Sequence, residues 1–284
     1  MLLINGWAGY EALSVLTRDK SLTVEACGQN AIYLRTSRDD IIILLRKTLT
    51  PFSISVAENL DTLNKLISIK LSAEFDSSSI VFENGLILNI QGDPIVRPVE
   101  FTGNINEKKL RFVYNCYRTL TSDSEFPDFM QDAIETVRTA SLTQVLSVCG
   151  KIVGLGRGYT PEGDDFVGGL FLGLRLLDIK VDPKPIVLRA LERSRWPSWK
   201  FIEHSYHGCT YAPVYRLCMS LILRLDPIEH LLDALRVGST TGFATVSGLL
   251  ETLTAFHSSL SKRSLTSFSS STGGDQATST TSSP

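Results

Sequence analysis

Residues 154–169 read Gly-Leu-Gly-Arg-Gly-Tyr-Thr-Pro-Glu-Gly-Asp-Asp-Phe-Val-Gly-Gly, and they mark the point where a glycine-rich loop passes into a helix. Three glycines alternate at positions 154, 156 and 158, and Thr160-Pro161 is a typical helix start. A loop of this kind ahead of a helix exposes backbone N–H groups, which favours the binding of an anion. The plainer alternative is that the glycines only shape a turn, and the residues alone leave both interpretations open.

Two adjacent acids, Asp164 and Asp165, stand in the first turn of this predicted helix. They would repel a bare anion, so the pattern suits a site in which Mg²⁺ bridges a carboxylate to a phosphate. The alternative is that they complement the helix dipole. Adjacent helical side chains point about 100° apart, so we expect one acid to contact the substrate or metal and the other to brace the loop. Both are candidate catalytic residues, and Asp164 is the candidate Mg²⁺ ligand.

The composition is that of an ordinary soluble protein and excludes several classes of partner. The 284 residues are 43% hydrophobic and 20% charged, with a net charge of −2, which gives no basic surface for nucleic acid or anionic membrane. The apolar run after the acids is broken by Arg175 and is too short to span a bilayer, and the first residues lack a signal-peptide pattern. Five scattered cysteines form no CxxC pair, which argues against a disulfide framework or a zinc site. We expect a cytoplasmic protein.

The first part of the chain, residues 1–104, is predicted to be a β-rich, barrel-like domain. Alternating or buried-type runs predict strands at 21–26, 30–36, 40–45, 53–56, 79–82 and 86–90, with one short helix at 59–69. Asn84-Gly85 between the last two strands is a strong hairpin signal.

Residues 105–257 are predicted to form a mainly helical domain that carries the glycine-rich motif, which gives an α+β fold overall. Helices are expected at 108–121, 129–149, 161–177, 185–194, 212–225, 227–237 and 245–258. Gly168, Gly169 and Gly173 each weaken a helix interior by about 1 kcal/mol, so another backbone or a ligand is expected to approach there. The final 27 residues, 258–284, include 16 Ser or Thr and are predicted to be a disordered tail.

A second segment resembles the first, because it has small residues and two threonine hydroxyls ahead of a predicted helix. It reads Val-Gly-Ser-Thr-Thr-Gly-Phe-Ala-Thr-Val-Ser-Gly-Leu-Leu over residues 237–250. Together the two segments resemble an AllH-type family, which includes a subunit of the anaerobic oxamate carbamoyltransferase complex of allantoin breakdown. The first carries every fixed position of the family's G-x-G-x-G-x-T-P-x-G-D-D motif. The second keeps the family's Gly238, Thr240, Thr241, Gly242, Thr245 and Gly248. The resemblance extends loosely over residues 20–257, including the 49–56 segment Leu-Thr-Pro-Phe-Ser-Ile-Ser-Val.

The resemblance implies a protein that binds a small anionic metabolite, with carbamoyl phosphate as one candidate, as part of a multi-subunit enzyme or a homo-oligomer. The expected binding residues lie in the two loops, which are predicted to converge on one ligand: Gly156, Arg157, Gly158, Thr160, Gly163, Thr240, Thr241, Gly242 and Thr245. As alternatives, Thr160, Thr240 and Thr241 are plain N-caps, Gly238 is a C-cap, and Arg157 is a solvated loop residue.

Two departures from the family pattern bear on activity. Ala244 stands where the family commonly has Asp, and Ser239 where it often has His. The competing hypothesis is therefore a non-catalytic binding or assembly subunit. We expect an open cleft beside Asp164 or Asp165 and the 240–245 loop for an enzyme, and locally capped, buried acids for an assembly subunit.

Other chemistries receive less support from the sequence. The motif is not a Walker A loop, since no Lys-Ser/Thr follows the glycines, and its spacing differs from the dinucleotide fingerprint. His204 and His207, three residues apart, are expected to be surface or hydrogen-bonded histidines rather than metal ligands. Cys149 and Cys209 are expected to be buried structural thiols, since no nucleophile elbow is present. A Mg²⁺-dependent kinase or phosphatase ranks last, because the motif has no phosphate-directed lysine.

Overall fold

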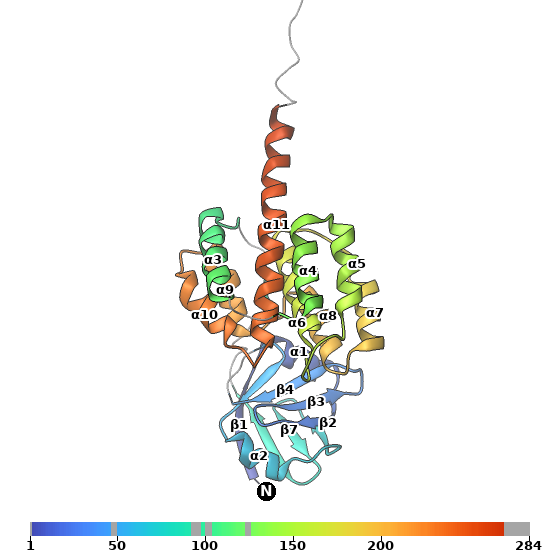
Figure 1. The fold of residues 1–284 in the computed structure, drawn as a ribbon. Coiled ribbons are helices and arrows are strands. Elements are labelled where there is room, and N and C mark those ends of the chain that lie inside the picture. Colours follow the sequence, from blue (N-terminus) through green and yellow to red (C-terminus); the bar gives the residue numbers. More distant parts are fainter. Residues whose placement is uncertain (1, 47–49, 92–97, 100–103, 123–125, 270–284) are drawn as a thin grey trace, which may run out of the picture.

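The structure is a computed structural model. It describes residues 2–46, 50–91, 98–99, 104–122 and 126–269, with side chains as far as residue 257. The predicted α+β fold is confirmed: an N-terminal β-barrel is followed by a mainly helical region (Figure 1). The domain boundaries at 104/105 and 257/258 remain predictions.

The barrel closes from eight strands. They are β1 (Leu2–Ala8), β2 (Ser21–Cys27), β3 (Ile32–Thr36), β4 (Ile41–Leu45), β5 (Ser53–Val56), β6 (Ser72–Phe75), β7 (Ser79–Phe82) and β8 (Leu86–Ile90). Their order around the barrel is β1-β5-β4-β3-β2-β6-β7-β8. The pairs β1–β8 and β4–β5 are parallel and the others antiparallel. Alternate side chains, such as Val24, Leu34 and Ile54, fill the interior and are fully buried.

The predicted strands all form, and between residues 2 and 90 the structure adds three elements that the sequence patterns did not indicate. These are β1, β6 and the helix α1 (Tyr10–Arg18), while the predicted 59–69 helix is α2 (Leu60–Leu66). In β1 the outward Leu3 and Trp7 are more apolar than the inward Gly6, so hydrophobic alternation points to the wrong face. α1 buries only Ala12, Val15 and Leu16.

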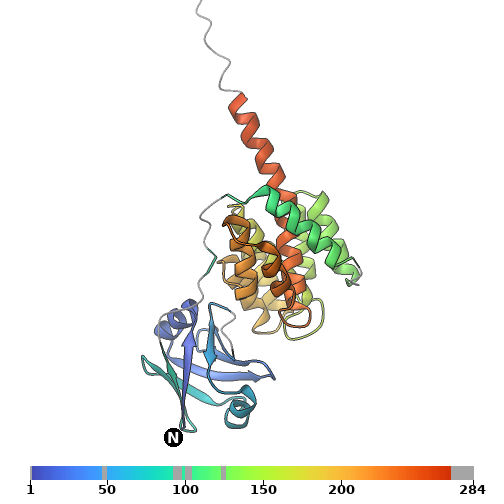
Figure 2. The same ribbon diagram turned by 90° about the vertical axis from the view of Figure 1, so that its left-hand side faces the viewer.

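The helical region is built around two helices packed side by side. Its elements are α3 (Glu107–Leu120), α4 (Asp128–Thr139), α5 (Leu142–Ile152), α6 (Glu162–Leu176), α7 (Lys184–Arg193), α8 (Ser198–Tyr206), α9 (Ala212–Ile222), α10 (Pro227–Leu235) and α11 (Thr241–Ser269). α6 is buried on nearly every side, and α11 runs beside it and projects away from the barrel (Figure 2). Within the described residues no helix has the length and apolarity needed to cross a membrane.

Glycines set the close approach of α6 and α11, as predicted. A Cβ on Gly169 would clash with the carbonyl oxygen of Thr245, and one on Gly248 would clash with that of Phe166. A Cβ on Gly173 would lie 2.9 Å from the Thr252 Cβ. The two backbones therefore touch at the level of the glycine-rich motif, which fixes the start of α6 against the start of α11.

Two helix predictions were wrong in their limits. The predicted 129–149 helix is two helices, because Ser141 begins α5 with a capping box that includes Gln144. α11 begins at Thr241 and continues to Ser269, so residues 258–269 are helical rather than a disordered tail. Extension of a helix already packed in a core adds one hydrogen bond per residue without a new nucleation step. Residues 270–284 of the predicted tail lie outside the described residues.

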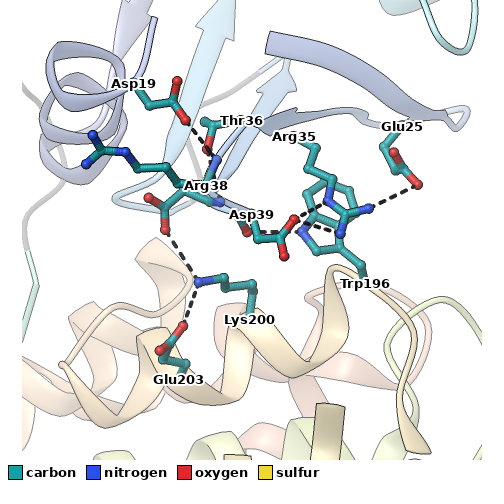
Figure 3. Close-up of polar contacts among 10 residues, drawn as sticks. Asp19, Glu25, Arg35, Thr36, Arg38, Asp39, Trp196, Lys200 and Glu203 are labelled. Carbon is teal, nitrogen blue, oxygen red and sulfur yellow. Dashed lines mark hydrogen bonds and ion pairs between the residues drawn. The ribbon is translucent and has the colours of Figure 1, made fainter. Parts of the chain in front are cut away.

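The barrel is attached to the helical region through polar contacts of the β3–β4 turn with the residues around α8 (Figure 3). The Trp196 indole N–H donates to the Asp39 carbonyl at 3.3 Å, and the Arg35 guanidinium lies 5.6 Å from the centre of the Trp196 ring. The ammonium of Lys200 lies between Asp40 (3.5 Å) and Glu203 (2.8 Å). These contacts bring one end of the barrel close to the start of α6.

Candidate functional site

The glycine-rich loop needs its glycines for backbone geometry. Gly154, Gly156 and Gly158 all have positive φ values, of 78°, 117° and 90°, where other residues are strained. A Cβ on Gly156 would also clash with the Glu162 carboxylate. Tyr159 extends from the loop onto the barrel, where its ring lies 5.1 Å from that of Tyr33. The turn-shaping role of these glycines, which the sequence left open, is therefore present, whatever else the loop does.

Several amides that were expected to hold an external anion are bonded to the chain itself. The Gly154 amide donates to Asp164 Oδ1 at 2.7 Å, and the Arg157 amide donates to the Glu162 carboxylate. At the helix start, the Gly163 amide donates to the Leu155 carbonyl. A Cβ on Gly163 would clash with the Ile152 carbonyl, so this glycine serves close packing. Two carboxylates of the protein thus occupy the place of an anionic ligand.

Asp164 braces this loop. It is 2% exposed, and its two oxygens accept from the Gly154 amide and, at 2.5 Å, from the Ser198 hydroxyl at the start of α8. Burial raises the pKa of Asp164, while the hydrogen bonds from Ser198 and Gly154 lower it. A Mg²⁺ ion on Asp164 would have to displace one of these donors. No described group of three or more His, Cys, Asp or Glu residues is arranged to hold a metal.

Asp165 has a different environment. It is 6% exposed, and its Oδ2 atom is buried without a hydrogen-bond partner in the described part of the chain. Burial raises the pKa of Asp165 well above its ordinary value, a hydrogen bond from Thr241 lowers it, and the charge of Asp164 raises it further. A buried polar atom without a partner is unfavourable and uncommon in native proteins. This oxygen can therefore accept a hydrogen bond from a ligand or a water molecule.

Asp165 lies in the wall of a small cavity between the barrel and the helical region. The described lining residues are Thr50, Phe52, Asp164, Asp165, Gly168, Phe201, Ser205, Cys209, Thr210, Tyr211 and Thr245. The space open to solvent-sized molecules is about 20 Å³, enough for roughly one or two waters. The lining includes four hydroxyl-bearing residues besides Tyr211 and no Lys, Arg or His. The cavity therefore suits a small polar group more than a fully charged anion.

The two predicted loops do converge, through side chains. The Thr160 and Thr241 hydroxyls lie 3.1 Å apart, and Thr245, which is 4% exposed, joins Asp165 in the cavity wall. Gly242 serves packing, since a Cβ there would clash with the Ala234 carbonyl. Thr240 is exposed, and its carbonyl accepts from the Ala244 amide.

Other sequence candidates lie away from the cavity or act as packing groups. Arg157 is exposed. Ala244, where the family commonly has Asp, is 2% exposed and belongs to the apolar cluster around α6. The His207 side chain is exposed and contacts Tyr206, whereas the His204 ring stacks on Phe52 at 4.8 Å. Burial lowers the pKa of His204 to about 4, so it is neutral at pH 7.

Sequence reasoning missed the lining residues Thr50, Phe52, Ser205, Thr210 and Tyr211. A signal was present for the first two, because the 49–56 segment belongs to the loose part of the family resemblance. Nothing in the sequence indicated, however, that this turn of the barrel would face α6.

Comparison with known proteins confirms the resemblance over part of the chain. No curated protein and no solved structure has significant similarity to it. The match to a family model covers about a third of the chain, and includes both glycine-rich segments and most of the cavity-lining residues but not the barrel. Residues 152–253 match the family described as oxamate carbamoyltransferase subunit AllH.

Proposed function

We propose that this chain is an AllH-type subunit of a carbamoyltransferase that binds a small anionic metabolite, such as oxamate or carbamoyl phosphate, with the carbamoyl end in the cavity beside Asp165. The observation that carries the proposal is the unpartnered Asp165 Oδ2 in a cavity wall shared with Thr245. Both residues belong to the two motifs of the segment that matches the family. The family description also supports other subunits as partners, and the five free cysteines fit a reducing compartment such as the cytoplasm.

The chemistry of a buried carboxyl group suits a carbamoyl group. A raised pKa favours the protonated carboxyl, which donates one hydrogen bond and accepts another. A terminal –CO–NH₂ group offers the complementary acceptor and donor. Asp165 thereby orients the carbamoyl group, and Thr245 supplies a further hydroxyl at the same wall.

The anionic end of such a metabolite is proposed to lie toward Gly156, Arg157, Gly158 and Thr160, as the sequence predicts. In the present arrangement the Arg157 amide is bonded to Glu162. Anion binding by the loop backbone therefore requires the ligand to replace the Glu162 carboxylate at this amide, which would change the loop and leave the Asp164 brace in place.

A non-catalytic assembly subunit is the second candidate, and one observation favours it. Position 244 carries a buried alanine in an apolar cluster, so this chain has no acid there to take part in group transfer. In this case the Asp164 and Glu162 bonds are part of a rigid motif that holds the start of α6 in place for a partner subunit.

Thermal denaturation with and without ligand separates the two candidates. We expect millimolar oxamate or fresh carbamoyl phosphate to raise the Tm of the wild-type protein by several degrees, because a ligand that binds only the folded state stabilises it. Asp165→Leu removes both the donor and the acceptor and should abolish the shift. The matched control is Asp128→Leu, at an exposed first-turn acid of α4, which should keep it. An unchanged wild-type Tm with oxamate, carbamoyl phosphate and phosphate, with or without Mg²⁺, supports the assembly subunit instead.

A further inference from the structure

Thr50 contributes a second unpartnered atom to the cavity, from the other half of the molecule. Its side chain is 1% exposed, and among the described residues its hydroxyl has no hydrogen-bond partner. Thr50 precedes β5 in the barrel, whereas Asp165 belongs to α6. Both line the same cavity, so two buried polar groups from separate parts of the fold face one small space without bonds.

The turn that carries Thr50 is held in place without the help of its hydroxyl. The Thr50 amide donates to the Ser53 hydroxyl at 3.1 Å, and that hydroxyl donates to the Thr50 carbonyl at 2.8 Å. The amide of Ala12 in α1 donates to the Pro51 carbonyl at 3.0 Å. Because the backbone of the turn is satisfied by these bonds, a hydroxyl at position 50 is not needed for its conformation.

The same turn reaches into the helical region through Phe52. This side chain is 1% exposed, and its ring lies 5.3 Å from Phe201 and 4.8 Å from His204, both in α8. The packing of Phe52 therefore places Thr50 against the cavity that Asp165 and Thr245 line from the opposite side.

Resting on the function proposed above, we propose that Thr50 is a ligand-binding residue, so that one ligand is held between the Thr50 hydroxyl of the barrel and the Asp165 carboxyl of α6. The group that enters is a neutral one with an N–H donor and a carbonyl acceptor, that is, a primary amide or carbamoyl end. An anionic group is disfavoured because the described lining residues include no Lys, Arg or His to pair with it.

The proposal gives the barrel a role in binding. Two unpartnered buried groups disfavour the packed arrangement of the two halves, and a ligand that bonds to both removes this disadvantage. Ligand binding should therefore strengthen the contact between the barrel and the helical region, in addition to stabilising α6.

The test compares Thr50→Val with Thr50→Ser in the full-length protein, using oxamate as the probe and calorimetry to measure Kd. Valine keeps the shape and removes the hydroxyl, so we expect oxamate to bind about five- to tenfold more weakly, the loss of one neutral hydrogen bond. Serine keeps the hydroxyl and should bind within about twofold of the wild type. Without ligand, the urea midpoint of Thr50→Val should equal or exceed that of the wild type, since a hydroxyl with no partner is removed.

The outcomes separate this inference from the proposed function. If Asp165→Leu abolishes binding while Thr50→Val binds oxamate as the wild type does, the inference is wrong and the proposed function stands. Urea denaturation gives the free energy of unfolding without ligand, and Kd gives the free energy of oxamate binding. If Thr50→Val lowers the first by as much as it weakens the second, the hydroxyl has a structural role and the inference is overturned. If the wild type itself binds no oxamate, the proposed function fails, and the role of Thr50 fails with it.

Discussion

The glycine-rich loop lies only a few residues before Asp165, which lines the neighbouring cavity. The two sites differ in whether their polar groups have hydrogen-bond partners within the protein. In the loop, the amides of Gly154 and Arg157 donate to carboxylates of the same chain. In the cavity, the Asp165 Oδ2 atom and the Thr50 hydroxyl are buried and have no hydrogen-bond partner among the described residues. The adjacent acids Asp164 and Asp165 therefore belong to two different environments.

On the function proposed above, a single motif combines a structural and a binding role. A loop whose donors are satisfied internally is rigid and holds the start of α6 in a fixed position. That rigidity allows one carboxyl oxygen to be kept in a buried, unfavourable state until a ligand bonds to it. On this account Asp164 stabilises the fold, and Asp165 is poised for binding.

The largest effect is expected from the loss of the brace. Asp164→Ala leaves the Gly154 amide and the Ser198 hydroxyl without their acceptor, and we expect the free energy of unfolding to fall by about 3 kcal/mol or more. Urea denaturation measures this loss. Asp164→Asn, which keeps one acceptor oxygen, should lose less, and a fall below 1 kcal/mol for Asp164→Ala would mean that the brace is dispensable.

Close packing of the loop against α5 gives the next effect. Gly163→Ala would introduce a Cβ against the Ile152 carbonyl, which should lower the free energy of unfolding by about 2–3 kcal/mol. The matched control is Gly150→Ala within α5, where a Cβ meets nothing within 4 Å. It should raise the stability by up to about 1 kcal/mol through helix propensity. Equal effects of the two substitutions would remove close packing as the reason for Gly163.

Asp165→Asn should have the opposite sign to Asp164→Ala. The pKa of Asp165 is raised in the folded state, so its contribution to stability is greatest below the unfolded pKa near 3.8 and is lost as the pH rises through the folded pKa. Asparagine does not titrate. The variant should therefore be more stable than the wild type at pH 7, by an amount on the order of 1 kcal/mol, and the gain should shrink toward pH 4. Thermal unfolding across this pH range measures it, and a constant difference would contradict the pKa shift.

The smallest effect is expected from Arg157. Its side chain is exposed, so Arg157→Ala should change the free energy of unfolding by less than about 0.5 kcal/mol. The affinity of the Arg157→Ala variant for oxamate should stay within about twofold of that of the wild type if the cavity residues supply most of the binding free energy. A tenfold weaker affinity, measured by calorimetry, would instead identify Arg157 as a clamp for the anionic end.

Much of this fold was predictable because its signals are local. Hydrophobic alternation and the Asn84-Gly85 turn predicted six of the strands, and Thr160-Pro161 predicted the start of α6. The break between α4 and α5 was also readable, since Ser141 and Gln144 have capping-box spacing. β1 was not, because its outer face carries Leu3 and Trp7 while Gly6 faces inward.

The site was predictable only in part, because its two halves come from distant segments. The motif indicated Asp165 and Thr245, and the structure places both at the cavity. Asp164 and Asp165 differ in environment because the Ser198 hydroxyl donates to Asp164. Only the packing of α8 against α6 brings Ser198 to that position. Thr50 depends on how the barrel docks, and no local pattern specifies that.

The central claim is that Asp165, and not Asp164, contacts the ligand, and a carboxyl ¹³C NMR titration with and without oxamate tests it most directly. We predict that Asp165 titrates well above pH 4 in the free protein and that saturating oxamate shifts its resonance and its pKa, while the Asp164 resonance stays nearly unchanged. A resonance of Asp165 that titrates near its ordinary value and ignores oxamate, or a response confined to Asp164, would contradict the account.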